Sequence, residues 1–277
     1  MENKELAALA YELREKVLDV IVGAGTGHIG GDMSVMDILV MLYFRHMNIS
    51  PENAESADRD RFVMSKGHSV ESYYTVLAEK GFFPYEELRD TFSRFSSKFI
   101  GHPNNKLPGV EMNSGSLGHG LSVCVGMALA GKLDHADYRV YTVVGDGELA
   151  EGSVWEGAMA ASHYKLDNLC AVIDRNMLQI SGTTEEVMSH EPLKERWKSF
   201  GWHVIEAKGN DMESLDQAFT EAKKTTGQPT VIIAQTTKGY GSEVMENQAS
   251  WHHKVPSMEQ YTQIKADLRQ RKAALLK

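Results

Sequence analysis

From residue 139 onward, short β-branched runs alternate with stretches of helical periodicity. The runs cover residues 139–144, 169–174, 202–206 and 230–235, and the helical stretches cover residues 149–163, 192–200 and 212–224. Runs of this length are typical of buried parallel strands, and stretches of this kind are typical of crossover helices. The pattern predicts an α/β fold with a mostly parallel sheet and helices on both faces.

Further helices are expected outside this region. Apolar residues at helical spacing indicate a helix near residues 6–21 and a second over residues 35–44, with Ser34 as its N-cap. Small residues indicate another over residues 120–132, and residues 258–276 have the pattern of an amphipathic C-terminal helix. No linker or repeat divides the chain, so we expect residues 1–277 to form one domain.

Composition excludes several classes of protein. The chain has 38 Asp plus Glu against 29 Lys plus Arg, a net charge of 29 − 38 = −9, which argues against a nucleic-acid binder. Its longest apolar run, residues 38–44, is far shorter than the ~20 residues of a membrane span, and the N-terminus lacks a signal peptide's apolar segment. Cys124 and Cys170 are too few for a disulfide framework. We expect a soluble protein of the reducing cytoplasm.

The most informative segment is residues 143–148, VVGDGE, where a predicted strand ends in two glycines around Asp146. Backbone N–H groups in such a turn can approach phosphate oxygens closely. A carboxylate there would repel phosphates unless it held a bridging divalent cation, as Mg²⁺ commonly does. Asn176 follows the next strand, 176 − 146 = 30 residues later, so both should lie at one sheet edge. Gly-Asp-Gly alone could be an ordinary turn, but this context favours a metal–diphosphate site.

Histidines supply a second signal. Of the 11 in the chain, four stand in glycine- or loop-rich motifs: His28, His68, His102 and His252. An isolated histidine is usually a surface or satisfied core residue. Four in such motifs indicate a shared site, because imidazole can donate or accept a proton near neutral pH.

Taken together, these motifs resemble those of transketolases. Gly145-Asp146-Gly147 with Asn176 looks like the thiamine diphosphate-binding motif, and residues 145–169 resemble transketolases in particular. The resemblance spans roughly residues 5–259 and includes GHIGG, SKGHS, GHP, SGSLGHGLS and MENQASWH.

Thiamine diphosphate is the cofactor that this resemblance implies, with Mg²⁺ or Ca²⁺ held by Asp146, Asn176 and the Leu178 carbonyl. The implied cofactor contacts come from Gly115, Ser116, Leu117, Gly145, Asp146, Gly147, Glu151, Asn176 and Ile180, together with His68.

Individual roles follow from the same resemblance. Backbone groups near Gly115 and Leu117 would contact the aminopyrimidine, Ile180 would lie beside the thiazolium, and Glu151 would lie at a subunit interface. From the residues alone, the small residues after Gly115 could serve only close helix packing, and Glu151 could be an exposed helix charge.

The four histidines would act on the substrate. The resemblance implies that His28 and His252 bond the aldehyde or ketose oxygens and move protons. His102 would contact a hydroxyl of the transferred two-carbon unit, and His68 would touch the diphosphate and the donor.

A partner chain is also implied. In the family, this region is only the diphosphate-binding domain, and pyrimidine-binding and C-terminal domains normally follow, whereas this sequence stops at Lys277. We expect the N-terminal subunit of a split transketolase, in a heterotetramer with two copies of a C-terminal subunit. The assembly would transfer a two-carbon ketol unit from a ketose, phosphorylated in our expectation, to an aldose. The isolated chain would be inactive, because the family's Glu that activates the aminopyrimidine lies in the other domains.

Alternatives remain at this point. A deoxyxylulose-phosphate synthase, a 2-oxo-acid dehydrogenase subunit or a non-catalytic cofactor-binding module would share the metal motif. The chain also departs from the family pattern: His119 replaces a usual Gln, Ile29 a common Pro and His253 a frequent Gly. The added imidazoles could change the substrate hydrogen bonds or the pH response. Phosphorylated pentoses, branched sugar phosphates and sulfonated sugars are all open as substrates.

Overall fold

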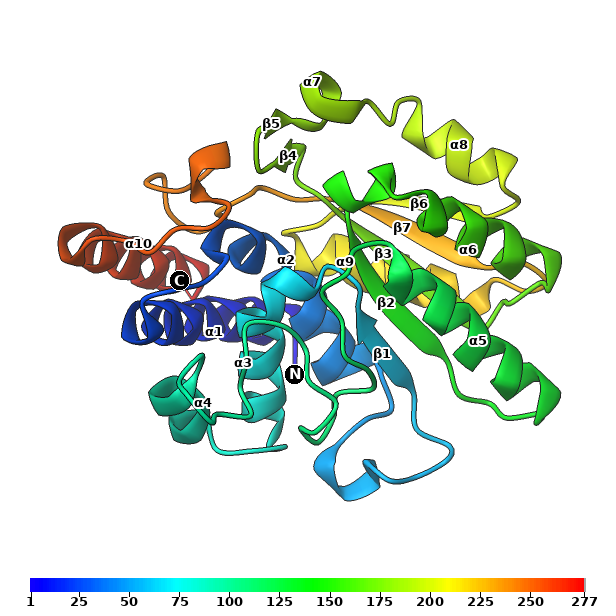
Figure 1. The fold of residues 1–277 in the computed structure, drawn as a ribbon, viewed down its shortest axis with the longest axis horizontal. Helices are drawn as coiled ribbons and strands as arrows, with labels where there is room; N and C mark the ends of the chain where they lie inside the picture. Colours follow the sequence, from blue (N-terminus) through cyan, green and yellow to red (C-terminus); the bar gives the residue numbers. More distant parts are fainter. Residues whose placement is uncertain (277) are drawn as a thin grey trace.

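A parallel sheet forms the centre of the computed structural model, which describes residues 1–276 (Figure 1). In sheet order its strands are β1 (Arg61–Met64), β2 (Val140–Gly145), β3 (Leu169–Arg175), β7 (Thr230–Gln235) and β6 (His203–Lys208). Every neighbouring pair is parallel. The expected α/β class is confirmed, and four of the strands lie where they were predicted. Of the strands in this sheet, β1 was not anticipated, because four residues are too few to give a clear pattern.

Helices cover both faces of this sheet (Figure 1). On one face lie α1 (Asn3–Ala24), α2 (Ile29–Met41), α3 (Val70–Lys80) and α9 (Met212–Lys224), and on the other lie α5 (His119–Leu133), α6 (Gly152–His163) and α8 (Leu193–Ser199). Alternate residues of each strand enter two separate apolar clusters, one under each helical layer. Every residue of β3 is buried, as expected for a central strand covered on both sides.

Shorter elements complete the fold. They are α4 (Tyr85–Thr91), α7 (Thr184–Met188) and a small hairpin of β4 (Leu178–Gln179) and β5 (Gly182–Thr183). The last helix, α10 (Met258–Leu276), packs along α1 and buries Ile264 and Leu268 there (Figure 1). None of the helices within residues 1–276 combines the length and the apolar character that crossing a membrane requires.

The second helix differs from its prediction. It begins at Ile29, six residues before the expected start, so Ser34 lies inside α2 and the predicted N-cap is wrong. The Ser34 hydroxyl instead donates to Asp174 Oδ2 at 2.6 Å. Gly30, which suggests a loop, is needed within the helix because a Cβ there would come within 2.6 Å of the Trp251 carbonyl oxygen.

The helix expected over residues 149–163 is interrupted at Glu151. A 3₁₀ turn covers Gly147–Ala150, Glu151 is extended, and α6 begins at Gly152. The prediction of one continuous helix is therefore wrong at its first turn. The interruption leaves Glu151 exposed beside the first turn of α6.

Arg14 holds the first two helices together from a fully buried position on α1. Its Nη2 donates to Asp37 Oδ2 at 2.5 Å and to the Met33 carbonyl oxygen at 2.8 Å. Asn210 Nδ2 also donates to Asp37 Oδ2, at 2.7 Å. The charges of Arg14 and Asp37 are therefore paired and hydrogen bonded inside the helical layer that carries His28.

We expect Asp37→Ala to lower the free energy of unfolding by about 3–5 kcal/mol, because it leaves the Arg14 charge buried without its partner. Glu79→Ala is the control, since it removes a partly exposed pair with Lys16 and should cost less than about 1 kcal/mol. Urea denaturation followed by circular dichroism measures both. Equal losses in the two variants would contradict the assigned role of Arg14.

Candidate active site

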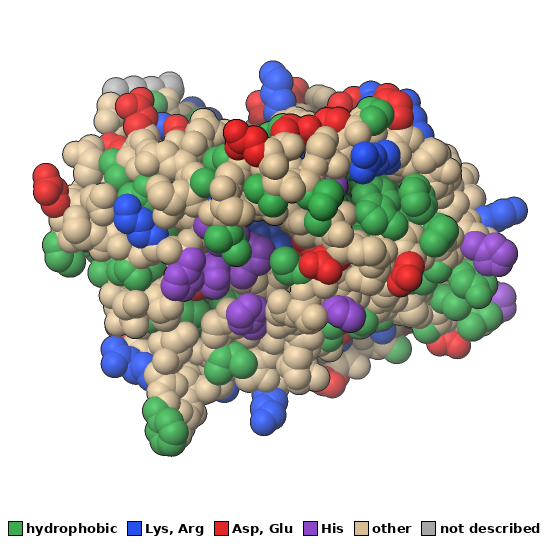
Figure 2. All heavy atoms as spheres, turned by 45° about the horizontal axis from the view of Figure 1, so that its top comes forward, with side chains coloured by type: hydrophobic (Ala, Val, Ile, Leu, Met, Phe, Trp, Pro, Cys, Tyr) green, Lys and Arg blue, Asp and Glu red, His purple; other side chains and the backbone are tan. Residues whose placement is uncertain are grey.

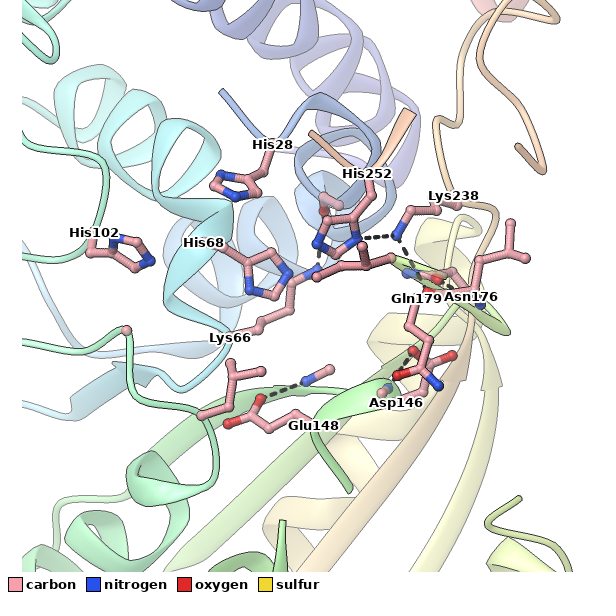
Figure 3. A pocket seen from close by; sticks show the side chains of 17 residues that line it. His28, Lys66, His68, His102, Asp146, Glu148, Asn176, Gln179, Lys238 and His252 are labelled. Carbon is pink, nitrogen blue, oxygen red and sulfur yellow. Dashed lines mark hydrogen bonds between the residues drawn. The ribbon is translucent and has the colours of Figure 1, made fainter. Parts of the chain in front are cut away.

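A cavity of about 220 Å³ opens at the carboxyl ends of the strands. Loops that follow β1, β2, β3 and β7 supply its walls, together with the start of α2. Figure 2 shows histidine side chains gathered around this hollow, and Figure 3 shows how the labelled side chains point into it. Ligand sites of open α/β sheets lie at this end because loops and helix N-termini converge there.

Most of the residues singled out from the sequence line this cavity. They are His28, His68, His102, Gly115, Leu117, Gly145, Asp146, Gly147, Asn176, Leu178, Ile180 and His252. Ser116 and Glu151 are not in the wall, and both are exposed. His119 is exposed at the start of α5 and also lies outside the wall. The roles of all these residues remain predictions, but the structure brings most of them to one place.

Asp146 joins the two loops that the sequence paired. Its Oδ1 accepts from Gly147 N–H at 2.8 Å, and its Oδ2 accepts from Met177 N–H at 2.5 Å. Asn176 stands directly before that second donor, and its Oδ1 accepts from Leu178 N–H at 3.1 Å. Met177 has a φ of 65°, in the left-handed region, so the chain turns back sharply after β3. Both side chains therefore lie at one sheet edge.

The donor set fits a hard cation bound to phosphate. It has one carboxylate at Asp146, one amide oxygen at Asn176 and one backbone oxygen at Leu178, all in the cavity wall. Within residues 1–276 no group of three or more His, Cys, Asp or Glu side chains is arranged to hold a metal. A cation here would complete its shell with water and ligand oxygens, as Mg²⁺ commonly does.

Sequence reasoning missed two lysines in this cavity. Lys238 Nζ lies 3.3 Å from the Leu178 carbonyl oxygen and 3.1 Å from His252 Nδ1 (Figure 3). Burial, and then the charge of Lys66, lowers the pKa of Lys238 to about 8. Lys66 stands inside the SKGHS motif, which was the available signal, whereas nothing local distinguishes Lys238 from a surface lysine.

Lys66 forms the buried ion pair beneath the cavity. Its Nζ lies 2.5 Å from Asp174 Oδ2 and 3.1 Å from the Gly31 carbonyl oxygen. Asp174 also accepts from the hydroxyls of Ser34 and Thr236. Both charges are therefore paired and hydrogen bonded, as buried charges require. This cluster fixes the start of α2 against the end of β3.

Glu148 is a second buried acid that sequence reasoning missed. Its Oε1 accepts from Gly118 N–H at 2.9 Å and its Oε2 from Gly145 N–H at 2.9 Å, and Ser65 also donates to it. Burial raises the pKa of Glu148, while these hydrogen bonds lower it. The side chain ties the loop before α5 to the Gly-Asp-Gly turn.

The charge of Asp146 is poorly compensated. Burial, and then the charge of Asp174, raises the pKa of Asp146 to about 6. The two backbone N–H groups that it accepts from act in the opposite direction. A carboxylate in this state gains stability from any cation that reaches it.

The four histidines form one cluster. The ring centroid of His28 lies 5.4 Å from that of His68, 5.8 Å from that of His252 and 6.3 Å from that of His102. Burial lowers the pKa of His28 to about 4 and that of His252 to about 3. Burial also lowers the pKa of His68 and of His102. All four are therefore neutral at pH 7 and can both donate and accept hydrogen bonds.

His253 extends this cluster outward. Its ring centroid lies 4.6 Å from that of His28, and its Nε2 lies 3.4 Å from Thr26 Oγ1. The side chain is exposed and does not line the cavity. Of the two added histidines, only His253 contacts the cluster.

Comparison with known proteins identifies the family. The family model described as "Transketolase, thiamine diphosphate binding domain" matches residues 6–271. The chain belongs to the transketolase family. Both the expected family and the expected N-terminal, diphosphate-binding portion are confirmed.

Relatives of two lengths match this transketolase chain. An apulose-4-phosphate transketolase subunit from Phocaeicola vulgatus is 48% identical over 98% of the chain and 96% of the relative. The 6-deoxy-6-sulfo-D-fructose transketolase subunit SqwG of Clostridium sp. is 40% identical over 95% and 96%. Human transketolase is 41% identical over 91% of the chain but only 41% of its own length. The transketolase structure from Campylobacter jejuni matches with a TM-score of 0.91 and 30% identity, over 99% of this chain and 46% of that one.

The chain therefore spans nearly the whole length of the two subunit relatives and less than half of the human and Campylobacter proteins. The match to the subunits supports the expectation of a split enzyme. The family's reaction is ketol transfer, and this portion is its thiamine diphosphate-binding part.

Acid should destabilise the folded chain through its neutral histidines. Their folded pKa values lie below the ordinary 6.5, so the unfolded chain binds protons first and stability falls as pH drops from about 6.5 toward 4. Between about pH 7 and 5, the free energy of unfolding should fall less in the double variant His28→Asn/His252→Asn than in the wild type. The difference should be about 1 kcal/mol per histidine, a value reduced for their partial exposure. Denaturation midpoints across this pH range measure the difference.

His163→Asn is the control, because His163 is exposed at the end of α6. It should keep the wild-type dependence on pH. A double variant as acid-sensitive as the wild type would show that the two cavity histidines are not held neutral.

Proposed function

We propose that this transketolase chain is the N-terminal subunit of a two-component enzyme that binds thiamine diphosphate with Mg²⁺ or Ca²⁺. With its partner it transfers a two-carbon ketol unit from a ketose to an aldose. The observation that carries the proposal is the hydrogen bond from Met177 N–H to Asp146, beside four neutral imidazoles. This bond joins the two loops that carry the expected metal ligands, Asp146 and Asn176, both of which line the cavity.

Cofactor binding is assigned to the loops after β2 and β3. Asp146, Asn176 and the Leu178 carbonyl would hold the cation, and the backbone at Gly145 and Gly147 can approach the diphosphate. Lys238 now lies against the Leu178 carbonyl, and its ammonium can turn to the diphosphate when a cation takes that oxygen. When bound, thiamine diphosphate supplies the nucleophilic carbon that breaks and forms C–C bonds.

The histidines orient the substrate and hold its protons. Lys238 Nζ donates to His252 Nδ1, which places the His252 proton on Nε2. That N–H can donate to a sugar carbonyl oxygen in the cavity. His28 and His102, also neutral, can accept protons from hydroxyl groups and return them, which is general acid–base work.

A partner subunit is proposed to complete the site. The cavity of about 220 Å³ is smaller than the ~300–1,000 Å³ of sites that enclose a ligand, so this chain alone covers part of it. Ser116, between the cavity residues Gly115 and Leu117, and Glu151 are both exposed and are available to another chain. We propose a C-terminal subunit with pyrimidine-binding and C-terminal domains, in a heterotetramer of two copies of each chain.

The substrate is proposed to be an anionic sugar. The relative from Phocaeicola vulgatus is named for a phosphate, and the one from Clostridium sp. for a sulfo sugar. We propose that this chain acts on the ketose end that is cleaved, and that groups of the partner select the anionic terminus. Buried free thiols at Cys124 and Cys170 support a cytoplasmic location.

The chain alone should not catalyse ketol transfer, whereas the chain with its partner should. Affinity purification from the native host, with a tag on this chain, should recover a second protein, and the purified pair should convert a sugar-phosphate ketose and an aldose in a coupled assay. Equal activity of the isolated chain would contradict the split site. A pair that binds the cofactor but transfers nothing from phosphorylated or sulfonated ketoses would contradict the proposed reaction.

Removing one proposed metal ligand should strongly weaken cofactor binding. Asp146→Ala should weaken thiamine diphosphate binding in the presence of Mg²⁺ at least about 100-fold, or about 2.8 kcal/mol, measured by isothermal titration calorimetry on the assembled pair. Asp137→Ala, at an exposed position before β2, should bind as the wild type does. Chelation should stop activity, and Mg²⁺ or Ca²⁺ should restore it. Undiminished binding by Asp146→Ala would contradict the proposed metal site.

A further inference from the structure

Two buried acids beneath the His28 turn have no part in the site described above. Asp32 lies in the first turn of α2 and Glu71 in the first turn of α3, with exposed fractions of 0% and 1%. Lys66, whose charge reaches Asp32, forms its ion pair with Asp174 instead. Two carboxyl groups removed from water without a cation of their own must lower their charge in another way.

The carboxyl groups of Asp32 and Glu71 interact directly, since each shifts the pKa of the other. Asp32 Oδ2 and Glu71 Oε2 are both buried, and within residues 1–276 neither has a hydrogen-bond partner. An ionised carboxylate only accepts hydrogen bonds, so a proton on one of the two groups would let it donate to the other and would satisfy both oxygens. Burial, and then the charge of Asp32, raises the pKa of Glu71 well above its ordinary value, and burial raises that of Asp32 to about 6. Both shifts favour retention of one proton by the pair.

The same pair is attached to the active-site histidine. Glu71 Oε1 lies against the backbone of the turn that carries His28, where the His28 N–H can donate to it. Gly27 permits this approach, because a Cβ at that position would stand 2.8 Å from Glu71 Oε1. Asp32 Oδ1 in turn accepts from Ser72 N–H at 2.8 Å, which joins the first turns of α2 and α3. His28 precedes the first of these helices, and its ring lies in the cavity.

We propose that Asp32 and Glu71 share one proton and act as positioning residues that hold the His28 turn, and so the His28 imidazole, in the substrate cavity. This inference rests on the proposed ketol transfer for its effect on rate, but not for the shared proton. With one proton the pair carries a single negative charge, which the N-termini of α2 and α3 favour. Without that proton, two like charges would face each other in the interior.

The first test compares two replacements of Glu71 in the assembled enzyme. Glu71→Gln keeps the contacts, because its amide N–H donates to Asp32 and its amide oxygen accepts from His28. It should retain kcat/KM for the ketose within about threefold. Glu71→Ala removes both contacts and should lower kcat/KM at least about tenfold while leaving the affinity for thiamine diphosphate within about twofold. Glu79→Ala, at an exposed position on α3, should match the wild type.

A double-mutant cycle shows whether Glu71 acts through His28. If it does, Glu71→Ala should lower kcat/KM by less than about twofold when His28 is already Ala. Independent, multiplying effects would overturn the proposal. So would a Glu71→Gln enzyme that folds but is as impaired as Glu71→Ala.

The shared proton is tested without any activity. Infrared difference spectra of the isolated full chain at neutral pH, wild type minus Glu71→Gln, should contain the C=O stretch of a protonated carboxyl. Hydrogen exchange should find the His28 amide protected in both proteins. Absence of the carboxyl band overturns the proposal even if Glu71→Ala fails to fold. If the carboxyl band is present but the wild-type chain with its partner subunit shows no ketol transfer, the result contradicts the proposed function and not the shared proton.

Discussion

The hydrogen bond from Met177 N–H to Asp146 is the contact on which the candidate site depends. It spans the loops after two adjacent parallel strands, β2 and β3, and so fixes Asp146 against Asn176 before any ligand arrives. Beneath it, the ion pair of Lys66 and Asp174 anchors the start of α2 to the end of β3. The sheet edge and the His28 turn are therefore fixed relative to each other. A site assembled from distant segments requires such fixed positions.

The charges of the cavity residues suit a diphosphate and a cation that bind together. Asp146 is buried, its pKa is raised to about 6, and a bound cation would stabilise its charge. Lys238 forms no ion pair within residues 1–276, so its ammonium can pair with an anion. The histidines add no positive charge, because burial lowers the pKa of His28 to about 4. A diphosphate brings more negative charge than one divalent cation neutralises, and the Lys238 ammonium can balance the remainder.

Features of the fold and of the candidate site that depend on local sequence could be predicted, whereas those that depend on contacts between distant segments could not. The strands, and the pairing of Asp146 with Asn176, follow from local periodicity and the rule that parallel strands open at one edge. The early start of α2 was missed because Gly30 indicates a loop, and only its contact with Trp251 explains the glycine. Lys238 and Glu148 read as ordinary surface charges, since their burial depends on segments far away in the chain.

The buried charged and imidazole groups of the candidate site lower the stability of the folded chain when no ligand is bound. Buried like charges at Asp146 and Asp174, and imidazoles held neutral, oppose folding. The opposing contribution comes from the two apolar clusters on the faces of the sheet. A ligand that binds only the folded state adds free energy in proportion to the logarithm of its concentration over Kd. Cofactor and cation should therefore stabilise the part of the fold that packing stabilises least.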